Sequence, residues 1–383
     1  MTGRLKIGID ATFRLYGGSL THLRALLRCW RSASVDHSIL VFAAPQNVAL
    51  LREFAGTGVQ VVEQPSASSR GRRLVWFHTA FPAAIDSALP DVMLFPGGYM
   101  PARGVAAPSV VIFRNAAPFC EAVTWKRVGW RYRLAFALLG QQMRLSARRA
   151  TKLIFPSRFL LDVFVRRYGI DEARATVLYH GHDAWANPSR AEAQIPIAEG
   201  DRFILCISHL YRYKNIDRLI EGYHGALGAI GARKLVVAGD FTDREYGNEL
   251  RALIDKLNLR NQVVLTGAVG REALPGLIDR CDFFVFPSVC ENCPNTLIEV
   301  MAAGKALAVS DKASMPEICG DAALYYDPDD PEEIGAAMTE LCRNDARRVE
   351  LETAATKRAA TFPTWNDVGL QTLRELEAAC GRA

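Results

Sequence analysis

The sequence lacks a hydrophobic run long enough to cross a membrane. None of its stretches reaches 18 uncharged apolar residues, whereas a membrane-spanning helix needs about 20. The chain starts with MTGRLKIGIDATF, which passes from a short basic segment directly into a strand pattern, without the apolar core of a secretory signal. We therefore expect a cytoplasmic protein.

The sequence also lacks the cysteine arrangement of a disulfide framework or a zinc site. Its nine cysteines are scattered, and Cys206, Cys281 and Cys342 lie inside apolar runs, which favours buried, reduced thiols. Cys290 and Cys293 form one C-x-x-C, but no second C-x-x-C or H-x-x-x-H supplies the other half of a zinc site.

Two further patterns resemble metal ligands but have simpler explanations. His180 and His182 stand two residues apart, which would place both on one face of a strand, but no third ligand is near them in the sequence. Asp327 and Asp329 lie in an acidic loop, broken by proline, that would cap the following helix. We expect no metal ion and no cofactor.

Acidic residues are scarce in the first half of the chain. Residues 1–195 carry 25 Lys and Arg against 12 Asp and Glu, a net charge of +13, whereas residues 196–383 carry 21 against 29, a net charge of −8. A basic half joined to an acidic half indicates surfaces for different partners.

What the chain does contain is a repeated alternation of short apolar strands with connections of helix length. This alternation predicts an α/β protein with mostly parallel sheets that are buried on both faces. A length of 383 residues suits two domains. The expected strands are 6–13, 38–44, 59–64, 91–97, 109–115, 152–157, 175–183, 202–209, 234–240, 262–269, 283–288, 306–310 and 322–327.

The apolar pattern lapses between Trp185 and Asp201, and this lapse places the domain boundary. We expect four segments in chain order: an N-terminal Rossmann-like domain, a linker, a second Rossmann-like domain and a last helix that could pack on either domain, including back on the N-terminal one. Their expected bounds are 1–190, 191–200, 201–362 and 363–383.

One stretch, FFVFPSVCENCPNTLIEVMAAGKALAVS at 283–310, combines a buried strand, a polar loop and the start of a helix. Glu291 lies in the loop and Glu299 in the second helical turn. Free backbone N–H groups from Asn295 to Leu297, together with the helix dipole, favour an anion there. Two carboxylates beside such a site can hold hydroxyl groups on both sides of a phosphate, although solvated charges are the simpler alternative.

A second candidate loop follows the first strand. Gly17 and Gly18 precede a helical pattern that Ser19 or Thr21 can cap. A strand, a glycine turn and a helix form the layout of a loop that approaches phosphate, although the full G-x-G-x-x-G is missing. A plain tight turn explains the two glycines equally well.

Basic and aromatic residues alternate in the segment 124–152. Such a segment suits a helix with a solvated basic face, a contact with a membrane surface or a nucleic-acid surface. We favour the first two interpretations and expect no nucleic acid as a partner.

The motif ENCPNTLIEVMAAG resembles the E-x7-E motif of the retaining glycosyltransferases of family 4, whose GT-B fold has two Rossmann-like domains facing a central cleft. Other segments are similar to family patterns over most of the chain, most closely from about 200 to 335. They are the turn Lys214-Asn215, VVAGD, VVLTGAV, the F-x-x-P-S from Phe284 to Ser288, SDKASMPEICGDAALYYDPDDPEEI, YHGHD and FPSRFLLDVFVRRYGI.

The resemblance implies roles for individual residues. Glu299 would hold the ribose hydroxyls of a nucleotide, Glu291 would contact hydroxyls of the donor sugar, and Lys214 would bind the diphosphate leaving group. The other donor-binding residues that it implies are Gly17, Gly18, Ser208, His209, Gly267, Ala268, Pro294, Asn295, Thr296 and Leu297.

The sequence departs from the family pattern at two places. The family usually has Gly-Arg after the first strand of the second domain, where this chain has Ser208-His209, and Arg212 could supply the missing charge. Many members have His-Asp after the fifth strand, where this chain has Arg114-Asn115. We expect Asn115 to make the donor-side contact. The residues expected on the acceptor side are Arg114, Trp125, Arg127 and Arg131.

The resemblance implies a retaining hexosyltransferase that moves a sugar from GDP-mannose or a UDP-sugar to a hydroxyl of a glycan or lipid-linked glycan. Synthesis of cell-surface polysaccharide or lipopolysaccharide is the expected setting, with peripheral contact at the inner face of an anionic membrane. The alternatives are a nucleotide-sugar epimerase or a phosphorylase of the same fold, or a non-catalytic glycan-binding homologue.

Overall fold

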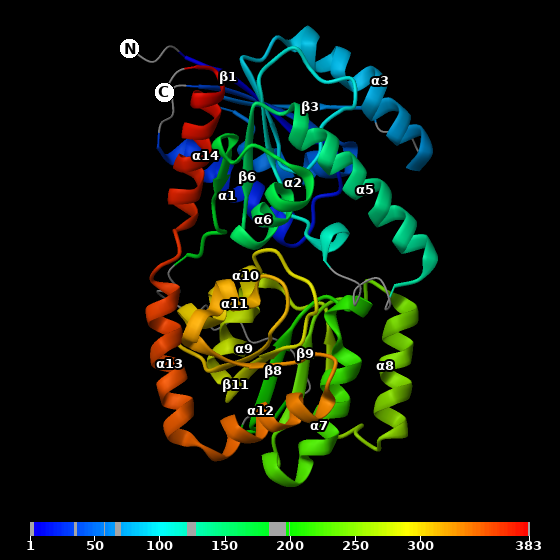
Figure 1. Cartoon of the computed structure of the whole chain (residues 1–383), viewed down its shortest axis with the longest axis vertical. Helices are drawn as coiled ribbons and strands as arrows, with labels where there is room; N and C mark the ends of the chain where they lie inside the picture. The colour runs from blue at the N-terminus through cyan, green and yellow to red at the C-terminus, as the bar shows by residue number, and fades with distance from the viewer. Residues whose placement is uncertain are drawn as a thin grey trace. The chain divides into compact units, whose positions relative to one another are not determined.

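The chain forms two compact units in a computed structural model (Figure 1). The structure describes residues 4–33, 37–56, 58–65, 70–120, 128–183, 197–198 and 200–381. Unit 1 comprises 1–119, 134–181 and 363–383, and unit 2 comprises 120–133 and 182–362. Residues 120–133 therefore group with the second unit, although the sequence analysis assigned them to the first domain, and most of the expected linker lies outside the described residues.

Unit 1 is built on a seven-stranded sheet with the order β3-β2-β1-β4-β5-β6-β7. All the pairings are parallel, and they begin with Lys6 opposite Ser38 and Ile7 opposite Val92. Strands β1, β2, β4, β5 and β6 are almost wholly buried, because helices cover both faces and favour runs of apolar residues. The strands are β1 (Lys6–Ala11), β2 (Ser38–Ala43), β3 (Val59–Glu63), β4 (Val92–Phe95), β5 (Ser109–Ile112), β6 (Lys152–Phe155) and β7 (Ala175–Val177).

The helices of unit 1 include the last helix of the chain. Figure 1 shows α14 beside α1, where the Trp30 indole N–H donates to the carbonyl oxygen of Gly369 at 2.8 Å. Of the two domains on which the last helix could pack, the structure groups it with the first. The helices are α1 (Gly18–Ser32), α2 (Pro45–Leu51), α3 (Arg70–Ala88), α5 (Trp130–Arg149), α6 (Arg158–Tyr168) and α14 (Trp365–Ala379), and the first turn of α5 groups with unit 2.

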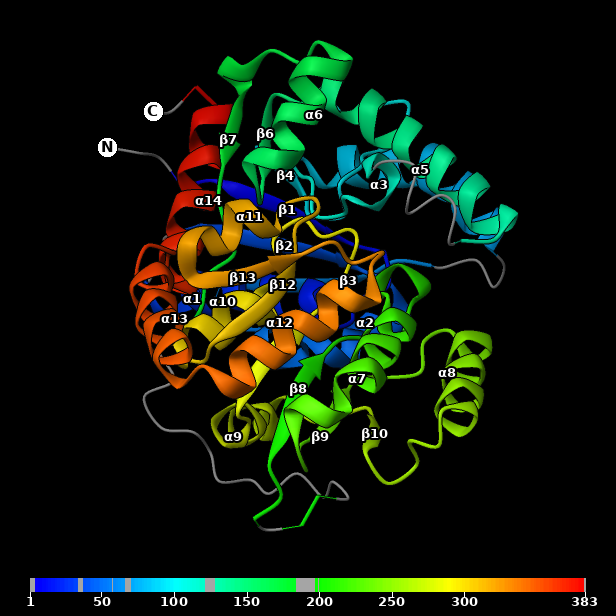
Figure 2. The same ribbon diagram turned by 60° about the horizontal axis from the view of Figure 1, so that its bottom comes forward.

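Unit 2 has a six-stranded parallel sheet with the order β10-β9-β8-β11-β12-β13 (Figure 2). Its strands are β8 (Phe203–Ile207), β9 (Lys234–Ala238), β10 (Val263–Gly267), β11 (Phe283–Phe286), β12 (Leu307–Ser310) and β13 (Ala323–Tyr326). Its helices are α7 (Ile216–Ile230), α8 (Arg244–Lys256), α9 (Leu274–Arg280), α10 (Asn295–Ala302), α11 (Met315–Cys319), α12 (Pro331–Arg343) and α13 (Asp345–Ala359).

The strand order reverses once in each unit, between β1 and β4 and between β8 and β11. In an open parallel sheet, ligands bind outside the carboxyl ends of the strands at such a reversal. All thirteen expected strands are present, each somewhat shorter than its sequence pattern. The expectation of two Rossmann-like α/β domains is therefore confirmed. Within the described residues, no helix combines the length and the apolar character that a membrane span requires.

Candidate functional site

Lys214 and Glu291 meet where the strand order of unit 2 reverses. Lys214 ends a 3-10 turn (Arg212–Lys214) that follows β8, and Glu291 lies in the loop after β11. The Lys214 ammonium donates a hydrogen bond to Glu291 Oε1, and the two side chains are only 14% and 13% exposed. A half-buried ion pair at the carboxyl ends of β8 and β11 occupies the place where this fold binds ligands.

The turn and the loop are joined by backbone and hydroxyl contacts. The Val289 N–H donates to the carbonyl oxygen of Tyr213 at 3.0 Å, and the Ser314 hydroxyl donates to the carbonyl oxygen of Glu291 at 3.1 Å. Lys214 Nζ lies 5.2 Å from the centre of the Tyr213 ring and 5.7 Å from that of Phe286. Two aromatic faces therefore help to hold the ammonium in place.

A disulfide joins the residue before Glu291 to a distant cysteine. Cys290 is bonded to Cys120, which is 170 residues away in the sequence and also groups with unit 2. The expectation of reduced thiols is therefore wrong for these two cysteines, because neither spacing nor local pattern indicates a pair so far apart. Cys206, Cys281, Cys293 and the remaining four are free thiols.

The helix α10 begins directly after this loop. Pro294 is its N-cap and provides no side-chain cap. Free N–H groups were expected from Asn295 to Leu297, but the Leu297 N–H donates to the carbonyl oxygen of Pro294 at 3.0 Å. Among described residues, the N–H groups of Asn295 and Thr296 have no backbone partner, and the buried Oδ1 of Asn295 has no hydrogen-bond partner either. The first turn of α10 therefore retains two donors that an anion can use.

Glu299 lies in the second turn of α10, where 7% of the residue is exposed. Burial raises the pKa of its carboxyl group, the neighbouring Arg271 lowers it, and Asp183 raises it. Arg271 Nη2 lies 2.9 Å from Glu299 Oε1. The sequence analysis identified Glu299 but missed Arg271 and Asp183, since no motif connects three segments that lie so far apart in the sequence.

Ser208 and His209 lie at the carboxyl end of β8. A Cβ atom at Gly239 would come within 1.9 Å of the Ser208 carbonyl oxygen, so the ends of β8 and β9 approach this closely only because residue 239 is glycine. Burial and the charge of Lys214 lower the pKa of His209, while Asp240 raises it. A neutral imidazole beside Lys214 can accept or donate a hydrogen bond near the site.

Gly267 and Ala268 follow the end of β10. Gly267 has a φ angle of 73° at an irregularity in the pairing of β10 with β9, a backbone conformation that favours glycine. Its carbonyl oxygen accepts hydrogen bonds from Gly239 N–H at 3.0 Å and the Thr266 hydroxyl at 2.8 Å. Ala268 is exposed, and the expected role of these two residues in donor binding stays a prediction.

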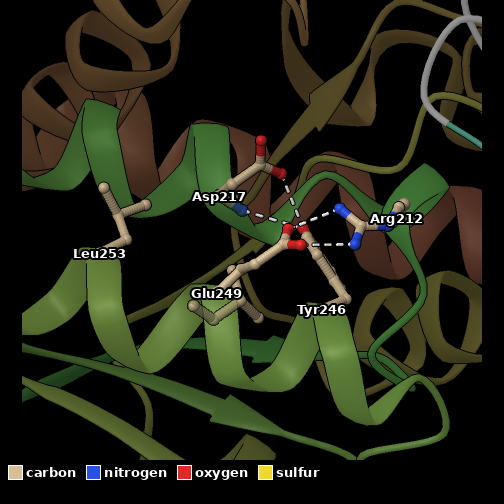
Figure 3. A pocket seen from close by; sticks show the side chains of 6 residues that line it. Arg212, Asp217, Tyr246, Glu249 and Leu253 are labelled. Atoms are coloured by element: carbon tan, nitrogen blue, oxygen red, sulfur yellow. Dashed lines mark hydrogen bonds and ion pairs between the residues drawn. The ribbon is translucent and has the colours of Figure 1, made fainter.

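Arg212 is paired with Glu249 on the neighbouring helix α8 (Figure 3). Its guanidinium binds both carboxylate oxygens of Glu249 on α8, at 2.5 and 2.6 Å, and lies 5.4 Å from the centre of the Tyr246 ring. Together with Asp217 and Leu253, these residues line a separate pocket of about 360 Å³. In the structure the guanidinium of Arg212 is thus engaged by Glu249, and its expected role in place of the family's arginine stays a prediction.

The glycine loop of unit 1 has the shape of a turn that needs glycine. Gly17 is the N-cap of α1 with φ 49°, and its carbonyl oxygen accepts from the N–H groups of Leu20 and Thr21 at 3.1 Å. The expected side-chain cap by Ser19 or Thr21 is absent, because the Ser19 hydroxyl instead donates to the carbonyl oxygen of Tyr16 at 2.7 Å.

Arg114 fixes the same loop from the end of β5. Its guanidinium donates to the carbonyl oxygens of Pro96 at 3.0 Å and Gly18 at 3.2 Å, and burial lowers its pKa to about 10. Asn115 accepts a hydrogen bond from the Ala117 N–H at 3.0 Å and so closes a local turn. His22, which the sequence analysis missed, is buried nearby on α1, and neither ring nitrogen has a hydrogen-bond partner among described residues.

The remaining residues expected on the acceptor side lie along the basic segment. Arg131 is exposed on α5 and its guanidinium lies 5.4 Å from the centre of the Trp130 ring. Trp125 and Arg127 lie outside the described residues. In the part of the chain that the structure describes, no three His, Cys, Asp or Glu side chains gather closely enough to hold a metal ion.

Two family models match the chain and together cover most of it. Residues 16–185 match Glycosyltransferase Family 4, and residues 189–358 match Glycosyl transferases group 1. The division between the two matches falls where the structure passes from unit 1 to unit 2.

Curated relatives are 28–29% identical to the chain over the segments that match. The N-acetylgalactosamine-N,N'-diacetylbacillosaminyl-diphospho-undecaprenol 4-alpha-N-acetylgalactosaminyltransferase of Campylobacter jejuni is 29% identical over 214 residues, which are 55% of this chain and 56% of the relative. O-antigen chain mannosyltransferase B of Escherichia coli is 28% identical over 171 residues, 45% of this chain and 44% of the relative. The chain thus spans about half the length of these relatives.

A solved structure matches nearly the whole fold. Alr3699/HepE of Anabaena, in complex with UDP and glucose, superimposes with a TM-score of 0.75 at 18% identity, covering 98% of this chain and all of that one. Taken with the two family models, these likenesses show that the chain belongs to the family 4 glycosyltransferases of the GT-B fold.

Proposed function

We propose that the protein is a retaining glycosyltransferase that takes a sugar from a nucleoside-diphosphate sugar. The observation that carries the proposal is the position of Lys214 and Glu291 beside the first turn of α10, at the reversal of strand order in unit 2. A cation and two unpaired backbone N–H groups suit a diphosphate. Glu299, one turn further along α10, is placed to accept hydrogen bonds from ribose hydroxyls.

Catalysis in this proposal depends on stabilising the leaving group. As the bond between the sugar and the diphosphate breaks, negative charge grows on the diphosphate, and the Lys214 ammonium with the N–H groups of Asn295 and Thr296 lowers the energy of that charge. These groups supply positive charge from the chain itself, so we propose that transfer needs no metal ion.

Retention follows if the acceptor attacks from the face that the diphosphate leaves. The leaving phosphate oxygen then takes the proton of the acceptor hydroxyl, and Glu291, held by Lys214, contacts hydroxyls of the donor sugar. Positioning of the two substrates supplies the remaining rate enhancement. Arg114 and Asn115 stay candidates for contacts from unit 1.

For the acceptor we propose a hydroxyl of a glycan or lipid-linked glycan. The names of two relatives support this choice, since one refers to a diphospho-undecaprenol-linked sugar and the other to an O-antigen chain. The donor is then GDP-mannose or a UDP-sugar, in synthesis of a cell-surface polysaccharide or lipopolysaccharide. The excess of positive charge in residues 1–195 favours an anionic acceptor.

The test is a transfer assay with purified protein, a panel of nucleotide sugars and undecaprenyl-diphosphate-linked acceptors, with EDTA present. We expect release of nucleoside diphosphate that requires both substrates, and a product whose anomeric configuration by NMR equals that of the donor. Inversion would overturn the retaining mechanism. Product from nucleotide sugar alone would favour an epimerase, and sugar phosphate formed from inorganic phosphate would favour a phosphorylase.

A further inference from the structure

Exposed apolar side chains gather on two helices, α3 of unit 1 and α5, whose first turn groups with unit 2. Among described residues, most of the exposed large apolar side chains lie on these two helices. They are Leu74 and Val75 on α3, and Trp130, Tyr132, Leu134, Leu138 and Leu145 on α5. A folded chain seldom exposes so many large apolar groups together unless something covers them.

On α5 these residues, apart from Tyr132, form one stripe. Residues in a helix are offset by about 100° each, so Trp130, Leu134, Leu138 and Leu145 fall within about 80° of the helix circumference. The side chains of the first three are 69%, 55% and 63% exposed. The stripe is therefore continuous along most of α5, rather than a set of isolated exposed residues.

The opposite side of α5 is already used for packing. Met143 is fully buried there, the Ser146 hydroxyl accepts a hydrogen bond from the Met100 N–H at 3.0 Å, and a Cβ atom at Gly140 would lie 3.2 Å from Pro118 Cβ. One face of α5 therefore packs against the rest of the fold, and the apolar stripe faces outward.

The exposed residues of α3 and α5 lie on neighbouring helices. The side chains of His78 on α3 and Gln142 on α5 are hydrogen-bonded at 3.1 Å, and the helices run alongside each other in Figure 1 and Figure 2. Leu74 lies one turn before His78, and Leu138 lies one turn before Gln142. We call the exposed residues listed above, without Tyr132, the α3/α5 face.

Positive charge surrounds the α3/α5 face. Arg131, Arg148 and Arg149 are exposed on α5, the last two near its C-terminal end. The sequence contains no Asp or Glu at all from 70 to 85 or from 128 to 161. A protein partner with an acidic surface would match the charge but not the length of the apolar stripe.

We propose that the α3/α5 face binds the surface of a bilayer that contains anionic lipid. Leucine side chains on one face of a helix enter the boundary between headgroups and acyl chains, while arginines beside them reach anionic phosphates. Trp130 combines an apolar ring system with a polar N–H group, which suits the headgroup level. The inference rests on the proposed function in one respect only: binding to the bilayer would bring the enzyme to a lipid-linked acceptor.

Vesicle co-sedimentation without any sugar substrate tests this inference. Vesicles of phosphatidylcholine with about 30% phosphatidylglycerol should sediment the protein at low salt, and pure phosphatidylcholine vesicles or high salt should sediment much less. Leu134→Ser combined with Leu138→Ser should weaken binding by about tenfold or more. Arg148→Gln combined with Arg149→Gln should weaken binding to the anionic vesicles and reduce its salt dependence.

The matched control is Val349→Ser, which removes an exposed apolar side chain from α13 in unit 2 and should leave vesicle binding unchanged. Melting temperatures of all variants should equal that of the wild type, because the replaced side chains are exposed. Protein that stays in solution with anionic vesicles, or a leucine variant that binds like the wild type, would overturn the inference.

Self-association would be a different outcome. If sedimentation velocity showed a dimer that the leucine variant abolishes, the face would be an interface between copies of the chain, and the bilayer inference would be wrong. Nucleotide binding tests the proposed function independently of vesicle binding. The bilayer inference can therefore be wrong while the proposed function holds, and the reverse is also possible.

Discussion

Arg271 and Glu299 form an ion pair across 28 residues of sequence, with 2.9 Å between Nη2 and Oε1. Glu299 is nearly buried while Arg271 is more than half exposed, so the arginine is the member of the pair that can move. Burial favours the protonated form of the carboxyl group and Arg271 favours the ionised form. The pair therefore controls the charge state of the residue that we propose for ribose binding.

Replacing Arg271 should make nucleotide binding sensitive to pH. Ionised Glu299 accepts hydrogen bonds from ribose, and its pKa is already raised, so affinity should fall as the pH drops through that pKa. In Arg271→Gln the pKa rises further, and the loss of affinity should begin at higher pH. Calorimetric titration with UDP and GDP from pH 5 to pH 8 measures both profiles.

Arg271→Lys, which retains the positive charge, should restore most of the wild-type profile. Arg260→Gln serves as the control, because Arg260 is an exposed arginine that pairs with Asp255 elsewhere on unit 2. Coincident pH profiles for the wild type and Arg271→Gln would show that Arg271 does not act on Glu299.

Removing the ammonium of Lys214 should slow the chemical step. Without it, charge on the departing diphosphate is stabilised only by backbone N–H groups, and Glu291 loses its partner. We expect Lys214→Ala to lower kcat by about 100- to 1000-fold, in line with the loss of one preorganised donor. Lys256→Ala, at an exposed position on α8, should leave kcat unchanged, whereas a similar kcat for Lys214→Ala and the wild type would contradict the proposed role.

The Arg212–Glu249 pair should contribute to stability more than to turnover. The pair is partly exposed, so breaking it with Arg212→Gln should reduce the free energy of unfolding by about 0.5–1 kcal/mol. The reversed pair, Arg212→Glu with Glu249→Arg, should recover part of that loss, as thermal unfolding can measure. If Arg212→Gln instead lowered kcat as far as Lys214→Ala, the expectation from the sequence would be right and Arg212 would act on the leaving group.

The Cys120–Cys290 disulfide predicts a thiol count. Titration of the unfolded, unreduced protein with a thiol reagent should give seven thiols, and nine after reduction. Cys120→Ser and Cys290→Ser should each lower the melting temperature in the absence of reductant, and the double variant should lower it no further, because either change removes the same bond. Nine thiols before reduction would contradict the disulfide.

The sequence predicted the framework well and the connections within the site poorly. The strands could be predicted because parallel strands buried on both faces are short apolar runs. The region of Lys214 and Glu291 could also be predicted, since both follow strands that end at the same edge. Their direct pairing, the Arg271–Glu299 pair and the disulfide could not, because each depends on how separate loops meet. The pairing of Arg212 with Glu249 could not be predicted either, since nearness to Lys214 in sequence does not fix the partner of its side chain.

The most direct test of the account is whether Glu299 and the first turn of α10 bind a nucleoside diphosphate. Melting temperatures of the wild type and Glu299→Ala should be measured with UDP, GDP and ADP without added metal. A ligand that binds only the folded state, present at about 100 times its Kd, adds about 2.7 kcal/mol to stability. We predict a clear rise of the wild-type melting temperature with UDP or GDP and little or none for Glu299→Ala. No shift with any of the three, or equal shifts for the two proteins, would contradict the proposed donor site.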